Sequence, residues 1–235
     1  MWQSFLKSCD SWLKPSQGCL LCHDSIERLH LCADCLPLLQ QLIMSEQVCP
    51  WCAHLSVGGA ICGECQQNMP YFDRLWASYH LAFPLHQIIT EYKFHKQWSY
   101  APILAAWMQE NPPKWLSDLA LDGVIAMPLS RGRLFERGYN QSEWLFQFLS
   151  TSSLISSQHS KVKIRRLYRP PQSSLPLQQR YENVDGVFSI QNDVNERHLL
   201  LIDDVVTTCA TLNELARKLK GAGAASVSCW VLAKA

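Results

Sequence analysis

The strongest indication of the fold is one continuous stretch, His198-Leu199-Leu200-Leu201-Ile202-Asp203-Asp204-Val205-Val206-Thr207-Thr208-Cys209-Ala210-Thr211. Its apolar run ends in two acids, which is typical of a central strand of a parallel sheet whose carboxyl end reaches solvent. Ligands bind at that edge of such sheets. The hydroxyl-rich residues 207–211 precede an amphipathic segment, Leu212 to Lys220, so they are predicted to form a helix N-terminus whose free N–H groups bind phosphate. The stretch therefore predicts a sugar-phosphate site in which Asp203 and Asp204 accept hydrogen bonds from ribose hydroxyls.

The same stretch resembles the phosphoribosyl pyrophosphate (PRPP) motif of type I phosphoribosyltransferases, in which an apolar strand, two acids and two apolar residues precede Thr-Thr-Gly-x-Thr. The residues that this resemblance assigns to PRPP are Asp203, Asp204, Val205, Val206, Thr207, Thr208, Cys209, Ala210 and Thr211. Cys209 stands where the motif has glycine, and we expect a wider loop because a Cβ atom resists positive φ. The alternative is an ordinary strand-to-helix turn capped by threonines, which the adjacent acids disfavour.

Length and composition are those of a globular protein of two unequal parts. A chain of 235 residues with 48% hydrophobic residues can bury a sizeable core, and a net charge of +1 indicates no global preference for polyanions. No apolar run approaches the roughly 20 residues of a membrane span, and the first residues lack the profile of a signal peptide. We therefore expect a cytoplasmic protein with no membrane span. Apolar residues at helical spacing from Trp2 to Leu13 predict an amphipathic helix that docks on the core or on a partner.

Eight of the eleven cysteines occur in four Cys-x-x-Cys pairs. Nine residues separate the two pairs in each half, so residues 19–65 form an internal duplication. Without a secretion signal, such pairs predict metal binding rather than disulfides. Two Cys-x-x-Cys turns close a tetrahedral Zn(II) site and leave no position for substrate, so we predict two structural zinc ions. The predicted ligands are Cys19, Cys22, Cys32, Cys35, Cys49, Cys52, Cys62 and Cys65.

Other readings of the cysteine segment are weaker. His23, His30 and His54 are alternative ligands, but each repeat already supplies four thiolates. A redox dithiol is the alternative for any single pair, and four tandem pairs argue against it. Pairing within each repeat is favoured over a cross-braced arrangement because the second pair of each repeat precedes a possible helix, Leu36 to Met44 and Gln66 to Met69. Spacing alone leaves this open. Residues 1–69 are assigned to this zinc-binding module.

Residues 70–235 alternate between strand-like and helix-like segments. The predicted strands are Arg74–Leu81, Gly123–Pro128, Lys163–Leu167, Val187–Ile190, Leu199–Ile202 and Ser226–Leu232. The predicted helices are Pro84–Phe94, Tyr100–Glu110, Tyr139–Leu149 and Leu212–Lys220. This alternation predicts an α/β fold with a mainly parallel sheet and flanking helices, preceded by the small zinc-binding module.

A second constellation follows the strand that ends at Pro128. Three arginines and two glycines occur between Ser130 and Gln141, at the predicted sheet edge of Asp203. Guanidinium groups bind two phosphate oxygens at once, and glycines allow close backbone approach. The residues predicted to bind pyrophosphate are Arg131, Gly132, Arg133 and Arg137. The alternative is that Arg133 and Arg137 form a pair on a helix surface.

Together, these motifs resemble the ComF family of competence proteins, also called ComFC, over essentially the whole chain. The further residues that carry this resemblance are Lys93, Tyr139, Asn140, Gln141, Gln172, Arg180 and Asn183. The resemblance implies a type I phosphoribosyltransferase-like domain, with a hood at residues 70–120, a core sheet at 121–235 and a mobile loop between Tyr168 and Leu177. It also implies Mg(II) bound with PRPP, and handling of single-stranded DNA during DNA uptake in natural transformation, with DNA-processing proteins as partners.

The segment from His159 to Tyr181 contains no acid and interleaves basic residues with tyrosines. Such a strip predicts weak, non-specific binding of single-stranded nucleic acid. The alternative is a solvated basic loop. The predicted nucleic-acid contacts are Lys161, Lys163, Arg165, Arg166 and Arg169.

Two classes of function fit these motifs. A phosphoribosyltransferase would let a nucleophile attack C1 of PRPP while Mg(II) and the arginines hold the departing pyrophosphate. A non-catalytic module would bind PRPP or a nucleic-acid 5′-phosphate and connect single-stranded DNA to a partner. No residue stands out as a general base, the acceptor is not indicated, and fold alone does not distinguish the two classes.

Overall fold

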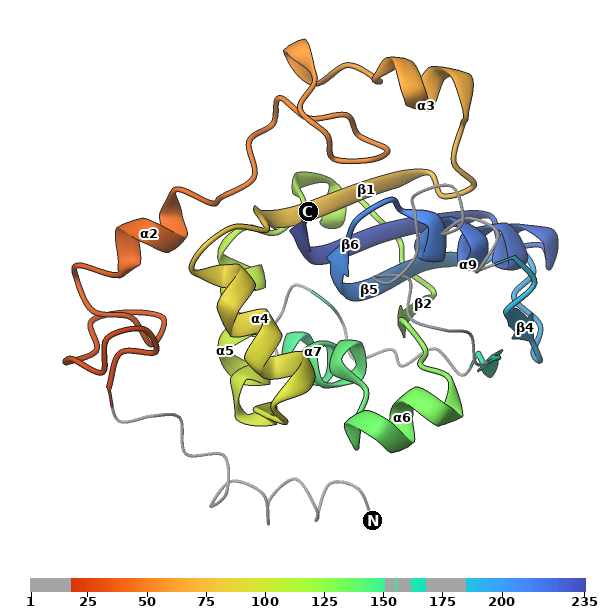
Figure 1. Ribbon diagram of the computed structural model, residues 1–235. Coiled ribbons are helices and arrows are strands. Elements are labelled where there is room, and N and C mark those ends of the chain that lie inside the picture. The colour runs from red at the N-terminus through yellow and green to blue at the C-terminus, as the bar shows by residue number, and fades with distance from the viewer. Residues whose placement is uncertain (1–17, 151–154, 156–161, 168–184) are drawn as a thin grey trace.

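The computed structural model describes residues 18–150, 155, 162–167 and 185–235 (Figure 1). The helices are α2 (Leu36–Gln40), α3 (Gly63–Gln67), α4 (Leu85–Phe94), α5 (Ala101–Glu110), α6 (Arg131–Arg137), α7 (Gln141–Leu149) and α9 (Ala210–Gly221), with short 3-10 turns η1 (Val57–Gly59), η2 (Trp98–Tyr100) and η3 (Lys114–Leu116). The strands are β1 (Arg74–His80), β2 (Gly123–Ala126), β3 (Ile164–Arg166), β4 (Phe188–Ile190), β5 (His198–Val206) and β6 (Ser226–Lys234). Within these described ranges, every helix is too short or too polar to cross a bilayer.

A four-stranded parallel sheet in the order β1-β6-β5-β2 forms the centre of the molecule. β5 lies between β6 and β2, and its apolar residues from Leu199 to Ile202 are fully buried. A strand that is covered on both faces is apolar throughout instead of alternating, which explains its sequence. The predicted α/β fold, with a mainly parallel sheet and flanking helices, is confirmed.

The strands predicted at 163–167 and 187–190 lie outside this sheet. They form β3 and β4, which pair antiparallel with each other, Arg166 opposite Phe188, as a separate two-stranded sheet. The expectation that they join the parallel sheet is therefore wrong. Exposed and partly buried residues alternate from Val162 to Leu167. This alternation is typical of a surface ribbon with one covered face.

Several predicted elements have different ends. β5 continues past the acids to Val206, and α9 begins at Ala210. The helix predicted from Tyr139 begins at Gln141, because the Asn140 side chain caps it by accepting a hydrogen bond from a backbone N–H at 3.2 Å. β1 comes from the segment assigned to the hood, yet it pairs with β6 in the central sheet.

The two cysteine repeats pack into two different hydrophobic cores, which lie on opposite faces of the sheet. The first repeat packs in the same core as α5 and α7, and the indole N–H of Trp107 donates to the Leu29 carbonyl at 2.9 Å. The second repeat packs in the core that contains α9. The link between them hydrogen-bonds to β1, with Met44 N donating to Ser78 O at 3.0 Å. In Figure 1, α4, α5 and α7 lie below the sheet and the second repeat with α3 lies above it.

Candidate phosphate site and metal centres

The eight paired cysteines form two groups of four, and each group comes from one repeat. Within a group, the sulfur atoms lie within 4.8 Å of one another. The Sγ atoms of Cys22 and Cys32 are 3.5 Å apart, and those of Cys52 and Cys62 are 3.6 Å apart. Zn–S bonds of about 2.3 Å in a tetrahedron place sulfurs about 3.8 Å apart, so both groups fit zinc. The expected pairing within each repeat is confirmed, and neither group includes a histidine.

The duplication is also visible in the backbone. The carbonyls of Cys19 and Cys49 accept hydrogen bonds at 2.9 Å from His23 and Ala53, which both have positive φ, 65° and 57°. Burial raises the pKa of Cys19 and of Cys49, but hydrogen bonds from nearby backbone N–H groups outweigh it and lower these pKa values to about 6 and about 7. The same turn, used twice, therefore favours the thiolate form of its first cysteine.

The two acids of the motif lie within the last residues of β5 and contact two different helices. The carboxylate of Asp203 accepts a hydrogen bond from Ser142 Oγ of α7 at 2.7 Å. The carboxylate of Asp204 forms an ion pair with Lys93 Nζ, at the end of α4, at 3.0 Å. Sequence reasoning identified Lys93 only through the family resemblance and did not predict this ion pair. The contact places α4, and hence the predicted hood, directly at the acid pair.

The loop after β5 connects the acids to α9. Thr207 is exposed, Thr208, Cys209 and Thr211 are half-buried, and Ala210 is buried. Cys209 has φ 60° and ψ −1°, so it adopts the left-handed conformation that glycine would adopt in the motif. The expectation that its Cβ avoids positive φ is therefore wrong. The left-handed conformation costs a residue with a Cβ atom on the order of 1 kcal/mol, which is small enough for the surrounding structure to impose it.

The arginine-rich segment after β2 is a helix. Ser130 caps α6 by accepting from Arg133 N at 3.4 Å, and Gly138 ends it in the left-handed conformation at φ 83°. Arg133 and Arg137 are half-buried, whereas Arg131 and Gly132 are exposed. Only two of the three predicted pyrophosphate arginines therefore point inward. Arg137 donates from Nη1 to the Gln141 side-chain oxygen at 3.0 Å.

Arg166 reaches this region from β3. Its Nη1 donates to the Pro128 carbonyl at 3.0 Å, and its guanidinium lies 5.2 Å from the ring centre of Phe188. Burial lowers the pKa of Arg166 to about 10. The nearby positive charges of Arg133 and Arg137 also lower this pKa, whereas the negative charge of Asp203 raises it. Arg166 therefore faces the acids and arginines of the site instead of the outer surface of the predicted basic strip. Exposure alternates from Val162 to Leu167, because successive side chains of a strand point to opposite faces, and Arg166 falls on the less exposed face.

The family-signature residues around Asn140 connect three elements of the site. Tyr139 donates from its hydroxyl to the Tyr92 carbonyl, and Tyr92 donates to the Gln141 carbonyl at 2.8 Å. Asn140 Nδ2 donates to Met127 O, just after β2, at 3.1 Å. These contacts, two of them buried, hold the end of α4, the start of α7 and the end of β2 in one arrangement. They position Lys93 against the acids.

Comparison with known proteins identifies the family. Competence protein F of Haemophilus influenzae is 31% identical over 227 residues, which cover 92% of this chain and 96% of that protein. The chain belongs to the ComF/ComFC family. DNA utilization protein YhgH of Escherichia coli K12 is 31% identical over 80% of this chain and 85% of its own length, and competence protein ComFC of Streptococcus pneumoniae is 27% identical over 87% of each chain. No family model matches the chain.

Several predicted residues of this ComF-family chain lie outside the described ranges. They are the N-terminal helix from Trp2 to Leu13, Lys161, Arg169, Gln172, Arg180 and Asn183. Three residues of the predicted nucleic-acid strip are described: Lys163 and Arg165 are exposed, and Arg166 is half-buried. Their binding to nucleic acid stays a prediction.

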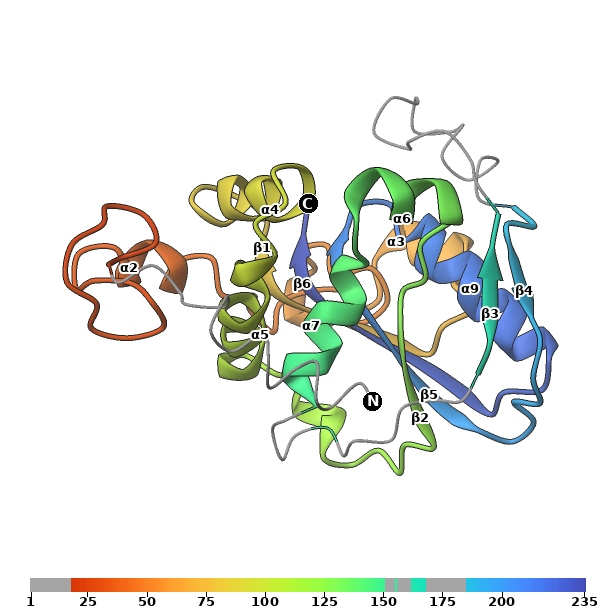
Figure 2. The same cartoon turned by 90° about the horizontal axis from the view of Figure 1, so that it is seen from below.

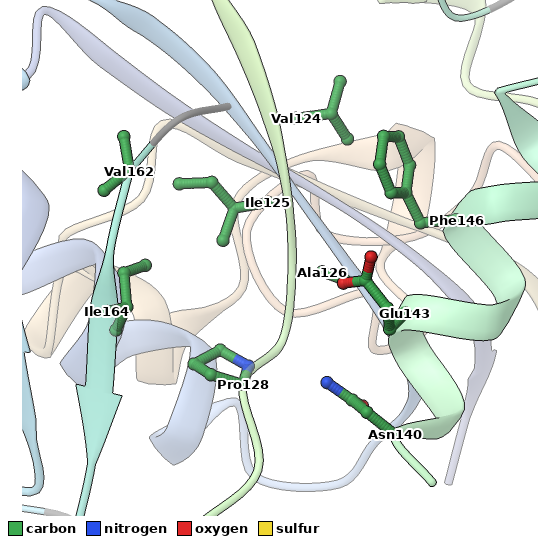
Figure 3. Close-up of a pocket in the computed structure, with 9 residues that line it drawn as sticks. All are labelled: Val124, Ile125, Ala126, Pro128, Asn140, Glu143, Phe146, Val162 and Ile164. Carbon is green, nitrogen blue, oxygen red and sulfur yellow. The ribbon is translucent and has the colours of Figure 1, made fainter. Parts of the chain in front are cut away.

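A pocket of about 240 Å³ lies beside β2 (Figure 3). It is lined by Val124, Ile125, Ala126, Pro128, Asn140, Glu143, Phe146, Val162 and Ile164. In Figure 3, Glu143 of α7 and the capping residue Asn140 reach toward β2, and Val162 and Ile164 line the opposite side. None of the residues assigned to PRPP is among these nine. The pocket is therefore adjacent to the candidate phosphate site and is not the site itself.

Replacing Asp203 by Asn is expected to stabilise the protein near neutral pH. Burial and the neighbouring Asp204 raise the pKa of Asp203 from 3.8 to about 6, although the Ser142 hydrogen bond and Lys93 oppose the shift. The folded state therefore holds this proton more tightly than the unfolded chain, and that contribution is full below about pH 4 and is lost as the pH rises through 6. Asn mimics the protonated acid at every pH. Urea unfolding should give a gain of about 2 kcal/mol at pH 7.5 and almost none at pH 4.

The parent protein at each pH is the control, because zinc loss in acid affects both proteins alike. A stability difference that is constant from pH 4 to 7.5 would contradict the raised pKa of Asp203.

Proposed function

We propose that this ComF-family chain binds PRPP with Mg(II) at the carboxyl edge of its central sheet and handles single-stranded DNA in natural transformation. The observation that carries the PRPP proposal is the convergence of the acid pair of β5, the N-terminus of α9 and the inward arginines. The names of the relatives, competence protein and DNA utilization protein, support the DNA part of the proposal.

Each part of PRPP has a matching group in this arrangement. The loop from Thr207 to Thr211 offers hydroxyls and backbone N–H groups to the 5-phosphate at the start of α9. Asp203 and Asp204 accept hydrogen bonds from the ribose hydroxyls, and carboxylate oxygens are also the protein ligands that Mg(II) prefers. When bound, Mg(II) would neutralise part of the pyrophosphate charge.

The charges of the site support an anionic ligand. Arg166 interacts electrostatically with Asp203, Arg133 and Arg137, while Lys93 pairs with Asp204. Four cations therefore accompany two acids, and a polyphosphate would offset the excess positive charge. Guanidinium groups bind phosphate oxygens in pairs, so the three arginines are suited to the pyrophosphate.

The double variant Asp203→Asn, Asp204→Asn tests the PRPP assignment. It removes both carboxylates, so we expect PRPP affinity in the presence of Mg(II) to fall at least tenfold, which corresponds to about 1.4 kcal/mol. Isothermal titration calorimetry measures this change. The matched control is Asp118→Asn, which alters an exposed acid in the η3 region and should leave the affinity unchanged. An unchanged affinity in the folded double variant would overturn the assignment.

Transferase activity and simple binding differ in one observable. In a transferase, Asp203, whose pKa burial raises to about 6, would be the group suited to exchange a proton near neutral pH. A transferase would release pyrophosphate from PRPP when the right acceptor is present, whereas a binding module would not. Incubation with PRPP, Mg(II) and a panel of nucleobases, amines and single-stranded DNA, with pyrophosphate as the readout, separates these two functions.

A further inference from the structure

The helix α6 exposes apolar residues to solvent and turns two of its arginines inward. Successive residues of a helix are about 100° apart, so Arg133 and Arg137 share one face while Arg131 and Phe135 share another. The arginine pair is half-buried and points toward the site. Phe135 is 92% exposed, and its neighbour Leu134 is also exposed. A surface helix normally buries its apolar residues, so this outward Phe requires a different explanation.

A second exposed phenylalanine lies at the end of α4. Phe94 is 62% exposed, and the Arg137 guanidinium lies 5.4 Å from its ring centre. In Figure 2, α4 and α6 are both at the end of the sheet toward which the strands point. Each of the two exposed rings therefore has an arginine on the same surface, Phe94 with Arg137 and Phe135 with Arg131. The two pairs border the candidate phosphate site.

We propose that Phe94 and Phe135 stack the bases of a single-stranded nucleic acid whose phosphates contact the exposed Arg131, while Arg137 supports the Phe94 ring from within. Exposed aromatic rings beside arginines are the combination that binds single strands without sequence preference. α6 carries three arginines and one acid, Glu136, so its surface favours a polyanion over a neutral apolar partner. The proposal deepens the proposed function and depends on its DNA part, because it names the surface that receives the strand.

The ribbon of β3 and β4 is less suited to stacking. Arg165 is exposed there, but the nearby ring of Phe188 is buried and covered by Arg166. Among the described residues, exposed phenylalanines accompany arginines at α4 and α6, and the ribbon supplies charge alone. A strand could contact both surfaces, but only the first would distinguish bases from phosphates.

The double variant Phe94→Ala, Phe135→Ala tests the proposal with two oligomers of equal length, a deoxythymidine 12-mer and an abasic 12-mer that carries the same phosphates without bases. Stacking of each base contributes on the order of tenfold in affinity, so the variant should bind the deoxythymidine oligomer at least tenfold more weakly than the parent does. Its affinity for the abasic oligomer should stay that of the parent. Fluorescence anisotropy at low salt measures both affinities.

The matched control is Tyr71→Ala. Tyr71 is 52% exposed and precedes β1, so this aromatic residue lies at the opposite, amino end of the strands. The control should bind both oligomers like the parent, and both variants should keep the parent's unfolding midpoint. Equal binding of the two oligomers by the parent would overturn the stacking proposal and leave the DNA part of the proposed function intact.

Absence of binding to either oligomer would overturn both. A Phe94→Ala, Phe135→Ala variant that keeps the parent's affinity for deoxythymidine would also overturn the proposal.

Discussion

Replacing Cys22 or Cys52 by Ser is expected to release one of two zinc ions and to unfold the repeat that contains the changed residue. Each group of four thiolates is closed around its metal position, so binding of zinc supplies folding free energy, on the order of 10 kcal/mol for small zinc modules. The loss of one ligand removes most of that contribution. Elemental analysis should give two zinc ions per chain for the parent and one for each variant, and limited proteolysis should cut only the altered repeat.

The two variants should differ in their effect on PRPP. The second repeat packs in the same core as the start of α9, where Ala53 and Ala210 are both buried, and the Cys209 thiol interacts electrostatically with Cys52. The first repeat packs on the other face of the sheet. Cys52→Ser is therefore expected to weaken PRPP binding, whereas Cys22→Ser should leave it near that of the parent. Fewer than two zinc ions in parent protein never exposed to a chelator would contradict both expectations.

The features that sequence reasoning predicted correctly depend on contacts that are local or periodic. The cysteine pairs predict their own grouping, because each Cys-x-x-Cys turn brings two sulfurs together whatever the rest of the chain does. The apolar run from Leu199 to Ile202 predicts a central strand, because burial on both faces leaves little room for polar residues. In both cases the residues that stabilise the feature are close together in the sequence.

The features that sequence reasoning missed depend on contacts between distant segments. Lys93 ends an ordinary amphipathic helix, and its pairing with Asp204 depends on how α4 packs against the sheet. Arg166 lies on the less exposed face of β3, unlike its neighbour Arg165, and the signal for this in the sequence is the period of two of a surface strand, which a count of charges does not use. Cys209 adopts positive φ because the end of β5 and the start of α9 fix its position, which overrides the preference of a single residue.

Replacing Lys93 by Met is expected to destabilise the protein by about 3 kcal/mol, because it leaves the Asp204 carboxylate without its counter-charge in a buried position. The side chains of Lys93 and Asp204 are only 18% and 9% exposed. Asp204→Asn combined with Lys93→Met removes both charges, so the double variant should recover most of this loss. Urea unfolding of the parent, both single variants and the double variant gives the coupling energy between the two residues.

Lys114→Met is the matched control for the loss of Lys93. Lys114 also pairs with an acid, Glu46, but the two side chains are 84% and 65% exposed. Solvent screens such a pair, so its loss should change the free energy of unfolding by less than about 1 kcal/mol. If Lys93→Met unfolded at the same urea concentration as Lys114→Met, the Asp204 carboxylate would be solvated as well as that of Glu46, and the ion pair would not be what holds α4 against the acids of the candidate phosphate site.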